Sequence, residues 1–187
     1  RWYEIGSVYT IVDAGLNTDL SESSRYMLAQ QAACAGKIVM SRTQCVSPEK
    51  EKETEEFLEK VLAEFQCSRS LEHDIYRKGW NKMNDSDFQE LTKSGYRTEK
   101  CGKLWMNQRE AYNSVYYMNL PIQETELKDA AEKILKDKEC GKVFRIKGFL
   151  KREDGSWMEL NITHDQMSVE PIPKGQEVII VIGEKLN

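Results

Sequence analysis

Two short apolar segments joined by a helical one occupy the first quarter of the chain and limit its fold most strongly. Val8–Val12 and Lys37–Met40 are continuous apolar runs of strand length, and Asp19 or Ser21 can cap a helix between them. A strand, a helix and a second strand in this order form a βαβ unit, whose two strands lie parallel in one sheet. Continuous apolar runs are typical of strands covered on both faces. We therefore predict a buried parallel sheet here.

Further elements are predicted around this unit. The first helix ends at Gly36, a residue common just after helix C-termini. The apolar stripe of that helix comprises Met27, Leu28, Ala32 and Ala35. A second helix runs from about Glu49 to Phe65, because Ser47-Pro48 combines a capping residue with a proline suited to the first turn. One more strand is expected near Asp74–Tyr76, and Ser86–Gln89 has the spacing of a capping box that opens a short helix.

The second half of the chain has a different pattern. Residues 92–104 are polar and contain two glycines, so we place a boundary or linker there, between a domain at 1–95 and a second at 105–187. The second domain has a strand at 111–120, an amphipathic helix at about 127–135, and three strands joined by short turns. Those three strands are expected at 143–150, 157–162 and 178–182. This order predicts an α+β domain with a small, mainly antiparallel sheet and helices on one face.

Composition and charge exclude several classes of protein. The 187 residues include 27 Lys and Arg against 31 Asp and Glu, and the net charge of −4 gives no general attraction to nucleic acid. The longest apolar run, Val178–Ile182, is far shorter than the roughly 20 residues of a membrane span. Five cysteines without a Cys-x-x-Cys pair indicate reduced thiols in a cytoplasmic protein rather than a zinc ribbon. We expect no nucleic-acid partner and no membrane association, and the oligomeric state is left open.

The start of the chain suggests a piece of a longer protein. Only seven residues precede the first strand, and the first is Arg1 rather than an initiator methionine. A nucleotide-binding protein holds phosphate with a Gly-x-x-x-x-Gly-Lys-Ser/Thr loop, and this sequence contains none. We therefore expect the phosphate-binding half to lie upstream of Arg1.

Two motifs carry a family resemblance. The first comprises Thr10-Ile11-Val12-Asp13-Ala14, then Gln31 to Met40, then Ser41-Arg42-Thr43-Gln44. The second comprises Gly141-Lys142-Val143-Phe144-Arg145-Ile146-Lys147-Gly148-Phe149 and Val178 to Asn187, with its Ile-Gly-Glu-Lys-Leu-Asn end. In this order and spacing they resemble the second half of the nucleotide domain and the C-terminal domain of CobW-type P-loop GTPases. That family handles metals and includes proteins of cobalamin biosynthesis.

The resemblance implies a nucleotide site shared with the upstream half. Ser41, Arg42, Thr43 and Gln44 match the family's base-recognition motif. The full-length protein would bind GTP or another nucleotide with Mg, and would handle a metal ion such as zinc or cobalt. Its implied partner is a protein client, a metalloenzyme or a corrinoid protein. The chain alone would be inactive, and no catalytic residue is assigned to it.

Gln44 and Arg42 depart from the family pattern. The family has an Asp at the position of Gln44, where its carboxylate accepts two hydrogen bonds from guanine, and a Lys at the position of Arg42. A neutral amide offers no pair of charged acceptors, and Arg and Lys are not interchangeable. Losing a charged hydrogen-bond partner costs roughly 1.5–3 kcal/mol. We therefore predict weak or altered guanine selectivity. The family's Cys-x-Cys-Cys metal motif lies upstream of the matched region, so we assign no metal site to this chain.

Other residues each have a functional and a structural interpretation. Arg145 and Lys147 lie two apart on a strand and share a face, where they contact an anion or partner or form the solvent side of a half-covered sheet. His164-Asp165 is a weak candidate for metal, because a site needs three or four converging ligands. The aromatic residues are more typical of a core than of a stacking platform. They are Trp105, Tyr112, Tyr116, Tyr117 and Trp157.

Two hypotheses for function follow. In the first, the chain is part of a CobW-like, nucleotide-dependent metal-handling protein and supplies the degenerate base-recognition edge and the C-terminal client domain. In the second, it is a non-catalytic interaction module derived from a degenerate GTPase and binds a metalloenzyme or corrinoid protein. The uncharged Gln44 motivates the second hypothesis, because it suggests relaxed selection for hydrolysis.

Overall fold

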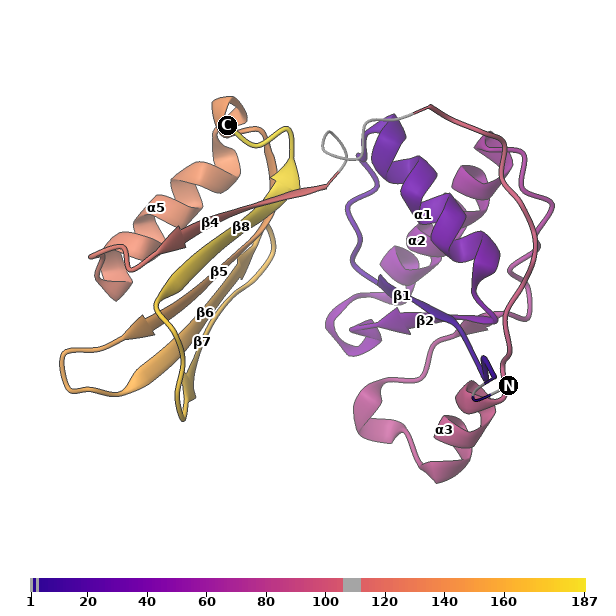
Figure 1. Ribbon diagram of the computed structural model, residues 1–187, viewed down its shortest axis with the longest axis horizontal. Helices are drawn as coiled ribbons and strands as arrows, with labels where there is room; N and C mark the ends of the chain where they lie inside the picture. Colours follow the sequence, from indigo (N-terminus) through magenta and orange to yellow (C-terminus); the bar gives the residue numbers. More distant parts are fainter. Residues whose placement is uncertain (1, 3, 106–111) are drawn as a thin grey trace. The chain divides into compact units, whose positions relative to one another are not determined.

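The chain folds into two compact units, Arg1–Trp105 and Met106–Asn187. The computed structural model describes residues 2, 4–105 and 112–187, and Figure 1 shows the elements of each unit. The polar segment 92–104 lies within the first unit. Its backbone is fastened there, because Arg97 N donates to Cys34 O and Gly102 N donates to Phe65 O.

The first unit contains a three-stranded parallel sheet. Its strands are β1 (Tyr9–Asp13), β2 (Lys37–Ser41) and β3 (Ile75–Tyr76), in the order β1-β2-β3. Two long helices, α1 (Glu22–Cys34) and α2 (Pro48–Glu64), pack against each other on this sheet (Figure 1). The predicted βαβ unit is confirmed: β1 and β2 pair in parallel from Tyr9 opposite Lys37 to Asp13 opposite Ser41.

Short-range chemistry sets where the helices begin. The Ser21 hydroxyl accepts from Ser24 N at the start of α1, and the Ser47 hydroxyl accepts from Lys50 N at the start of α2. The third helix, α3 (Asp85–Thr92), is capped by Asn84 together with Asp87, two residues earlier than the predicted box. Helix caps thus explain all three N-termini.

The core of the first unit lies between the sheet and the two long helices. On α1 the buried side chains are small, which lets a helix lie close to a sheet; they are Ser24, Ala29, Ala32 and Ala33. Met27 and Leu28 of the predicted stripe are only half-buried. The largest fully buried side chains of the unit come from the strands, from α2 and from the loop after it; they include Ile38, Met40, Leu58, Leu62 and Leu71.

Strand β1 is covered on one face only, in contrast to the prediction from its apolar run. Thr10 and Val12 are buried, whereas Tyr9 is 39% and Ile11 62% exposed. The central strand β2 buries consecutive residues and so is covered on both faces. β1 lies at the end of the described sheet, where one of its faces is open. An apolar run shows which side chains can be buried, and the position of the strand decides which of them are.

The second unit is a five-stranded antiparallel sheet with one described helix, α5 (Glu124–Lys136), against it. The sheet order is β4-β8-β5-β6-β7. The strands are β4 (Asn113–Met118), β5 (Lys142–Lys151), β6 (Trp157–Thr163), β7 (Met167–Ile172) and β8 (Val178–Glu184). The predicted α/β plus α+β fold class is confirmed. Ala111, the first residue of the predicted strand, lies outside the described residues.

Strand β7 is absent from the sequence-based prediction. It contains Pro171, which pairs opposite Met158 of β6. Proline has no backbone N–H to donate to a sheet, so within sheets it is found on edge strands, where the side that its nitrogen faces has no partner strand. β7 is the last strand in the sheet order, so the proline is tolerated there.

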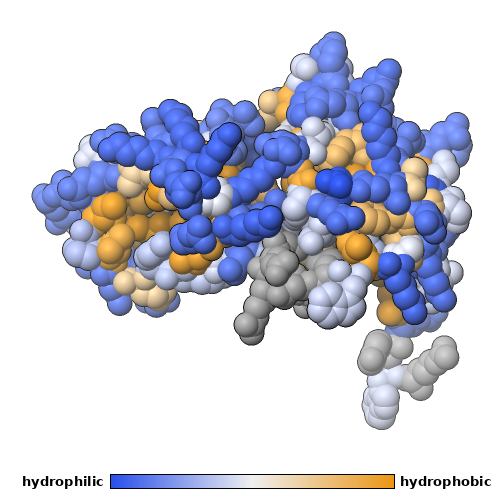
Figure 2. Space-filling view, turned by 90° about the horizontal axis from the view of Figure 1, so that it is seen from above, coloured by the Kyte–Doolittle hydropathy of each residue, from blue (hydrophilic) through white to orange (hydrophobic). Residues whose placement is uncertain are grey.

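Each unit has its own apolar interior and a largely polar surface. The core of the second unit joins α5 to the sheet; it comprises Leu127, Ala131, Val143, Ile146, Leu150, Met158, Leu160, Ile162, Ile179 and Val181. Hydrophilic residues cover most of the face seen in Figure 2, with smaller hydrophobic areas between them. Within the described residues, no helix combines the length and apolar character needed to cross a membrane.

Candidate functional site

The loops that follow the three parallel strands lie at one edge of the first sheet. Asp13 ends β1, Ser41–Gln44 spans the end of β2 and the start of a 3₁₀ turn, and Arg77–Gly79 follows β3. Because the strands are parallel, their carboxyl ends point the same way. Ligands of open α/β sheets bind outside the carboxyl ends of the strands. This edge is therefore the candidate site of the unit.

Asp13 connects the first two loops. Its Oδ1 accepts from Gly15 N at 2.9 Å, which closes the turn after β1. Its Oδ2 accepts from Arg42 Nη1, also at 2.9 Å. The backbone adds a bond of 2.8 Å from Ala14 N to Ser41 O. Two of these three hydrogen bonds, from Arg42 to Asp13 and from Ala14 to Ser41, thus join the end of β1 to the loop after β2.

Arg42 has an unusual backbone conformation. Its φ of 61° and ψ of 25° lie in the left-handed region, which non-glycine residues adopt rarely and at a cost of about 1–3 kcal/mol. Cys45 N donates to Arg42 O at 2.9 Å and closes the 3₁₀ turn Thr43–Cys45. Strained residues of this kind cluster at functional sites, so Arg42 marks the loop as a candidate on grounds independent of its sequence motif.

The loop after β3 lies against the loop after β2. A methyl group added at Gly79 would lie 3.5 Å from Gln44 Oε1 and 3.7 Å from Thr43 Oγ1. Gln44 itself is exposed, and Thr43 is half-buried. The amide of Gln44 is thus presented at the surface, with Gly79 beside it.

Cationic side chains near this edge are paired with acids. Arg77 contacts Glu51 at 3.4 Å and Glu55 at 2.6 Å, both on α2. Lys78 forms an ion pair with Asp87 of α3, and its hydrogen bond holds the pKa of Asp87 below the ordinary value. These ion pairs connect the loop after β3 to α2 and α3, and so they restrict its movement at one side of the candidate site.

Tyr76 lies directly before this loop. Burial and, after it, the neighbouring Asp87 carboxylate raise the pKa of Tyr76 to about 12. The phenol therefore stays protonated at neutral pH and carries no charge into the site.

The structure brings together all four residues of the predicted motif, Ser41 to Gln44, in one loop. It adds Asp13 and Gly79, which sequence reasoning did not place in the site. Asp13 had a signal, because it ends the apolar run of the first motif. Gly79 had none, because its role depends on the position of β3 beside β2.

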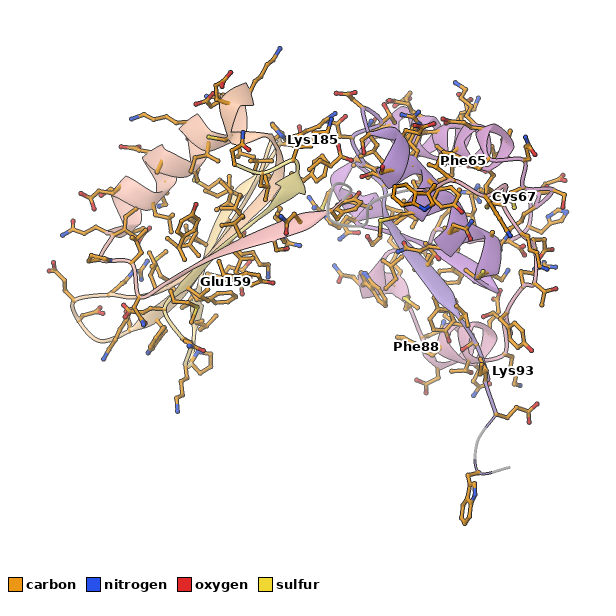
Figure 3. All side chains as sticks on the ribbon, turned by 45° about the horizontal axis from the view of Figure 1, so that its top comes forward. Phe65, Cys67, Phe88, Lys93, Glu159 and Lys185 are labelled. Atoms are coloured by element: carbon orange, nitrogen blue, oxygen red, sulfur yellow. The ribbon has the colours of Figure 1, made fainter. Side chains whose placement is uncertain are left out.

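Arg145 and Lys147 lie on β5, and their polar partners come from β6. Arg145 Nε donates to Asn161 Oδ1 at 2.7 Å, and Lys147 Nζ contacts Glu159 Oε1 at 2.8 Å. Figure 3 labels Glu159 on its strand. The neighbours of Lys147 on β5, Ile146 and Gly148, are buried toward the core. The two side chains therefore make cross-strand contacts, and their role as an anion or partner contact stays a prediction.

The remaining candidates have structural surroundings. His164 Nε2 lies 2.8 Å from Val143 O, within hydrogen-bond distance of a backbone group. Tyr116 and Tyr117 are consecutive on β4 and so point to opposite faces, which prevents them from forming one stacking platform. In the described part of the chain, no three His, Cys, Asp or Glu residues are placed to hold a metal ion.

An apolar cavity of about 170 Å³ lies between α5 and the sheet of the second unit. Leu127, Ala130 and Ile134 line it from the helix, and Val115 and Tyr117 line it from β4. The sheet is wider than a single helix can cover, which leaves this space over β4 and β8.

Two solved structures match this chain at low sequence identity. No family model and no curated protein matches the sequence. The crystal structure of Zn(II)-bound YjiA GTPase from E. coli is 18% identical, with a TM-score of 0.36, and the match covers 98% of this chain. A Zn(II)-bound triple mutant of YjiA is 16% identical over the same share, with a TM-score of 0.37. The chain spans 58% of the length of either structure. Both matches to the YjiA GTPase extend over nearly the whole length of this chain.

Proposed function

We propose that this chain forms the base-recognition edge of a nucleotide-binding domain, followed by a client-binding domain, in a CobW-like metal-handling protein. The nucleotide would contact the loop Ser41–Gln44, and Met106–Asn187 would bind the protein client. The observation that carries the proposal is the meeting of three loops at the carboxyl edge of a parallel sheet, with the motif residues in the central loop.

The contacts of Arg42 support a recognition role for this loop. Its ion pair with Asp13 and its left-handed backbone keep the loop in one conformation before any ligand arrives. A loop that is ordered in advance does not lose conformational entropy on binding, and this raises affinity for a base. The exposed Gln44 amide then supplies one donor and one acceptor to the base edge.

Because of Gln44, the selectivity between GTP and ATP is the sharpest test of the proposal. An amide recognises guanine without charge assistance, so GTP and ATP should bind the full-length protein with similar affinity. Gln44→Asp should restore two charged acceptors and favour GTP by about one to two powers of ten. Calorimetric titration with both nucleotides measures this. Arg145→Ala, in the other unit, is the matched control and should leave the ratio unchanged.

Two results would contradict the nucleotide proposal. One is an encoding gene that specifies no phosphate-binding loop upstream of Arg1. The other is a full-length protein that binds neither GTP nor ATP at millimolar concentration. Strong preference of the natural protein for GTP would contradict only the role of Gln44. The metal is handled upstream in this proposal, so zinc and cobalt binding should require the upstream half.

The second candidate function is a non-catalytic interaction module. The observation that favours it is the separate core of Met106–Asn187, which has its own sheet and helix and suits independent binding of a protein. Capture of the same metalloenzyme or corrinoid protein by this unit with and without nucleotide would favour the module. Measurable GTP turnover by the full-length protein would remove its main support.

A further inference from the structure

The two end strands of the sheet in the second unit differ in how their open edges are protected. These strands are β4 and β7, which lie at opposite sides of the sheet in Figure 1. Edge strands of natural proteins often carry charged residues, proline or a bulge, which prevent pairing with another chain. β7 contains Glu170 and Pro171. β4 contains no charged residue and no proline, and its register with β8 is continuous. β4 is therefore an unprotected edge.

The pairing of β4 with β8 shows which of its backbone groups point outward. In antiparallel strands, residues that bond to the neighbouring strand alternate with residues whose N–H and C=O point away from it. Asn119 N donates to the backbone oxygen directly before β8. Tyr116 and Met118, an odd number of positions away, therefore direct their backbone groups outward, and no described strand lies there. Ser114 follows the same alternation, but its N–H donates to Asn113 Oδ1 at 2.8 Å.

The side chains of β4 are apolar and exposed on both faces of this edge. Tyr116 is 61% and Met118 49% exposed on one face, and Tyr117 is 46% exposed on the other. Val115 and Tyr117 also line the apolar cavity between α5 and the sheet, so the cavity lies along the same edge. Exposed apolar side chains on an unpaired edge mark an interaction site. The partner that fits it is extended, uncharged and apolar at alternate positions.

We propose that β4 pairs with β4 of a second copy of this chain and joins the two sheets into one. β4 itself has the three properties that its partner needs. Like charges directly opposite each other destabilise a pair of strands, and two copies of β4 bring no charges together. A charged segment of another protein would gain no ionic contact from β4. The charge pattern thus favours a second copy over a charged partner.

A two-fold axis at Tyr116 fits the outward backbone groups. In this register Tyr116 exchanges N–H···O bonds with Tyr116 of the second copy, and Met118 N–H reaches Ser114 O of the second copy. On the cavity side, Tyr117 lies opposite Val115 of the second copy. Pairs of an aromatic and a β-branched residue stabilise antiparallel strands. The added strand would also separate the cavity from water along this edge.

The experiment measures the mass of the natural protein and the exchange of its amides. Analytical ultracentrifugation is run from about 1 μM to about 300 μM, which brackets micromolar dissociation constants. Dithiothreitol is present, so that disulfides do not contribute. We expect the mass to double as the concentration rises. Over the same range, hydrogen exchange of the Tyr116 and Met118 amides should slow by about tenfold or more, because pairing removes them from water.

Two variants at exposed positions test the assignment to β4. Tyr116→Lys places two like charges opposite each other at the axis and should keep the mass at that of one copy. Unchanged exchange of the β5 amides would verify that its sheet remains folded. Met167→Lys is the matched control, because Met167 is 39% exposed on the opposite edge strand. It should double in mass as the natural protein does.

Several outcomes would overturn the proposal. One is the mass of a single copy over the whole concentration range. Another is a doubled mass without slower exchange at Tyr116 and Met118, which would mean association through another surface. Slow exchange that does not depend on concentration would mean that these amides are already paired within one chain. A single-copy mass, with the amides slowed only by a synthetic peptide of alternating valine and threonine, would mean that the edge accepts other extended strands but not a second copy.

Discussion

The two units hold their charged side chains in different ways. In the first, Asp74 accepts from Arg69 at 3.0 Å and from Arg97 at 2.9 Å, and the Arg69 side chain is 1% exposed. In the second, Lys147 and Glu159 are 2.8 Å apart, but both side chains are more than a quarter exposed. The distances in the two ion pairs are nearly equal, so the difference between them is burial. The fold depends on the buried pair of Arg69 and Asp74, whereas water can replace the contact between Lys147 and Glu159.

Gly36 and Gly148 differ in what an added Cβ would meet. A Cβ at Gly36 in the first unit would lie 2.3 Å from the backbone oxygens of Ser94 and Gly95. A Cβ at Gly148 in the second would lie 2.6 Å from Cδ2 of Leu127, the end of a side chain. A side chain can rotate away, whereas a backbone carbonyl moves only with its whole segment. Gly36→Ala should therefore cost more than Gly148→Ala. The second unit also has backbone approaches of this kind, because a Cβ at Gly141 or Gly183 would lie 2.2 Å from a backbone oxygen.

Asp74→Ala should have the largest effect. Removing the carboxylate leaves the buried Arg69 charge uncompensated, which costs about 3–5 kcal/mol. Hydrogen exchange, read separately for each unit, should show lost protection in Arg1–Trp105 and little change in Met106–Asn187. Asp74→Asn keeps an acceptor and should cost less than Asp74→Ala. A loss below about 1 kcal/mol would mean that water reaches Arg69 and that the contrast between the units fails.

Gly36→Ala comes next. The added methyl group forces Ser94 and Gly95 away, and it weakens the bridges from Ser7 to Gly95 and from Ala35 to Tyr96. Overpacking of this kind costs up to about 3 kcal/mol. Denaturant unfolding, together with exchange of the Val8 and Arg97 amides that donate to Gly95 O and Cys34 O, measures it. Unchanged protection at those amides would show that the segment adjusts freely.

Gly148→Ala should cost about 1–2 kcal/mol, because Leu127 is buried but has a flexible end. Combining it with Leu127→Val, which removes a methylene from the contact, should give a total loss smaller than the sum of the two single losses. Strictly additive losses, determined from urea unfolding of the second unit, would place the strain elsewhere in the sheet.

Glu124→Gln should have the smallest effect and should alter pH dependence. Hydrogen bonds from Lys128, then from Arg152, hold the pKa of Glu124 below its ordinary value. A lowered folded-state pKa stabilises the unit above the unfolded-state pKa, and this stability is lost as pH falls through the folded-state value. Because the group is near the surface, the effect should be below about 1 kcal/mol. Unfolding of the second unit between about pH 6 and about pH 3 measures it, and an equally steep acid loss in the variant would point to other carboxylates.

Local sequence patterns predicted most of the fold. Ser47 acts on the chain within one helical turn, so the start of α2 could be read directly, whereas Asp19 and Ser21 both remained candidate caps for α1 until the structure showed Ser21. The order of apolar runs identified a parallel pair in one unit and antiparallel strands in the other. β7 was missed because Pro171 argues against a central strand, and only the sheet order shows that it lies at an edge.

The candidate site was predicted only in part for a similar reason. The loop Ser41–Gln44 is one continuous segment, and its residues were found together as a motif. Asp13 and Gly79 join it from the ends of β1 and β3, so their contribution depends on strand pairing between distant segments.

The sequence by itself determined the type of each sheet, the start of α2 and the continuous loop Ser41–Gln44 with its amide side chain. These features depend on side-chain periodicity, capping and residue identity within a few neighbouring positions. Only the tertiary structure decided which face of β1 is exposed and which acid holds Arg42. Those features depend on which distant segments lie side by side, because burial and pairing are set by neighbours in space rather than in sequence.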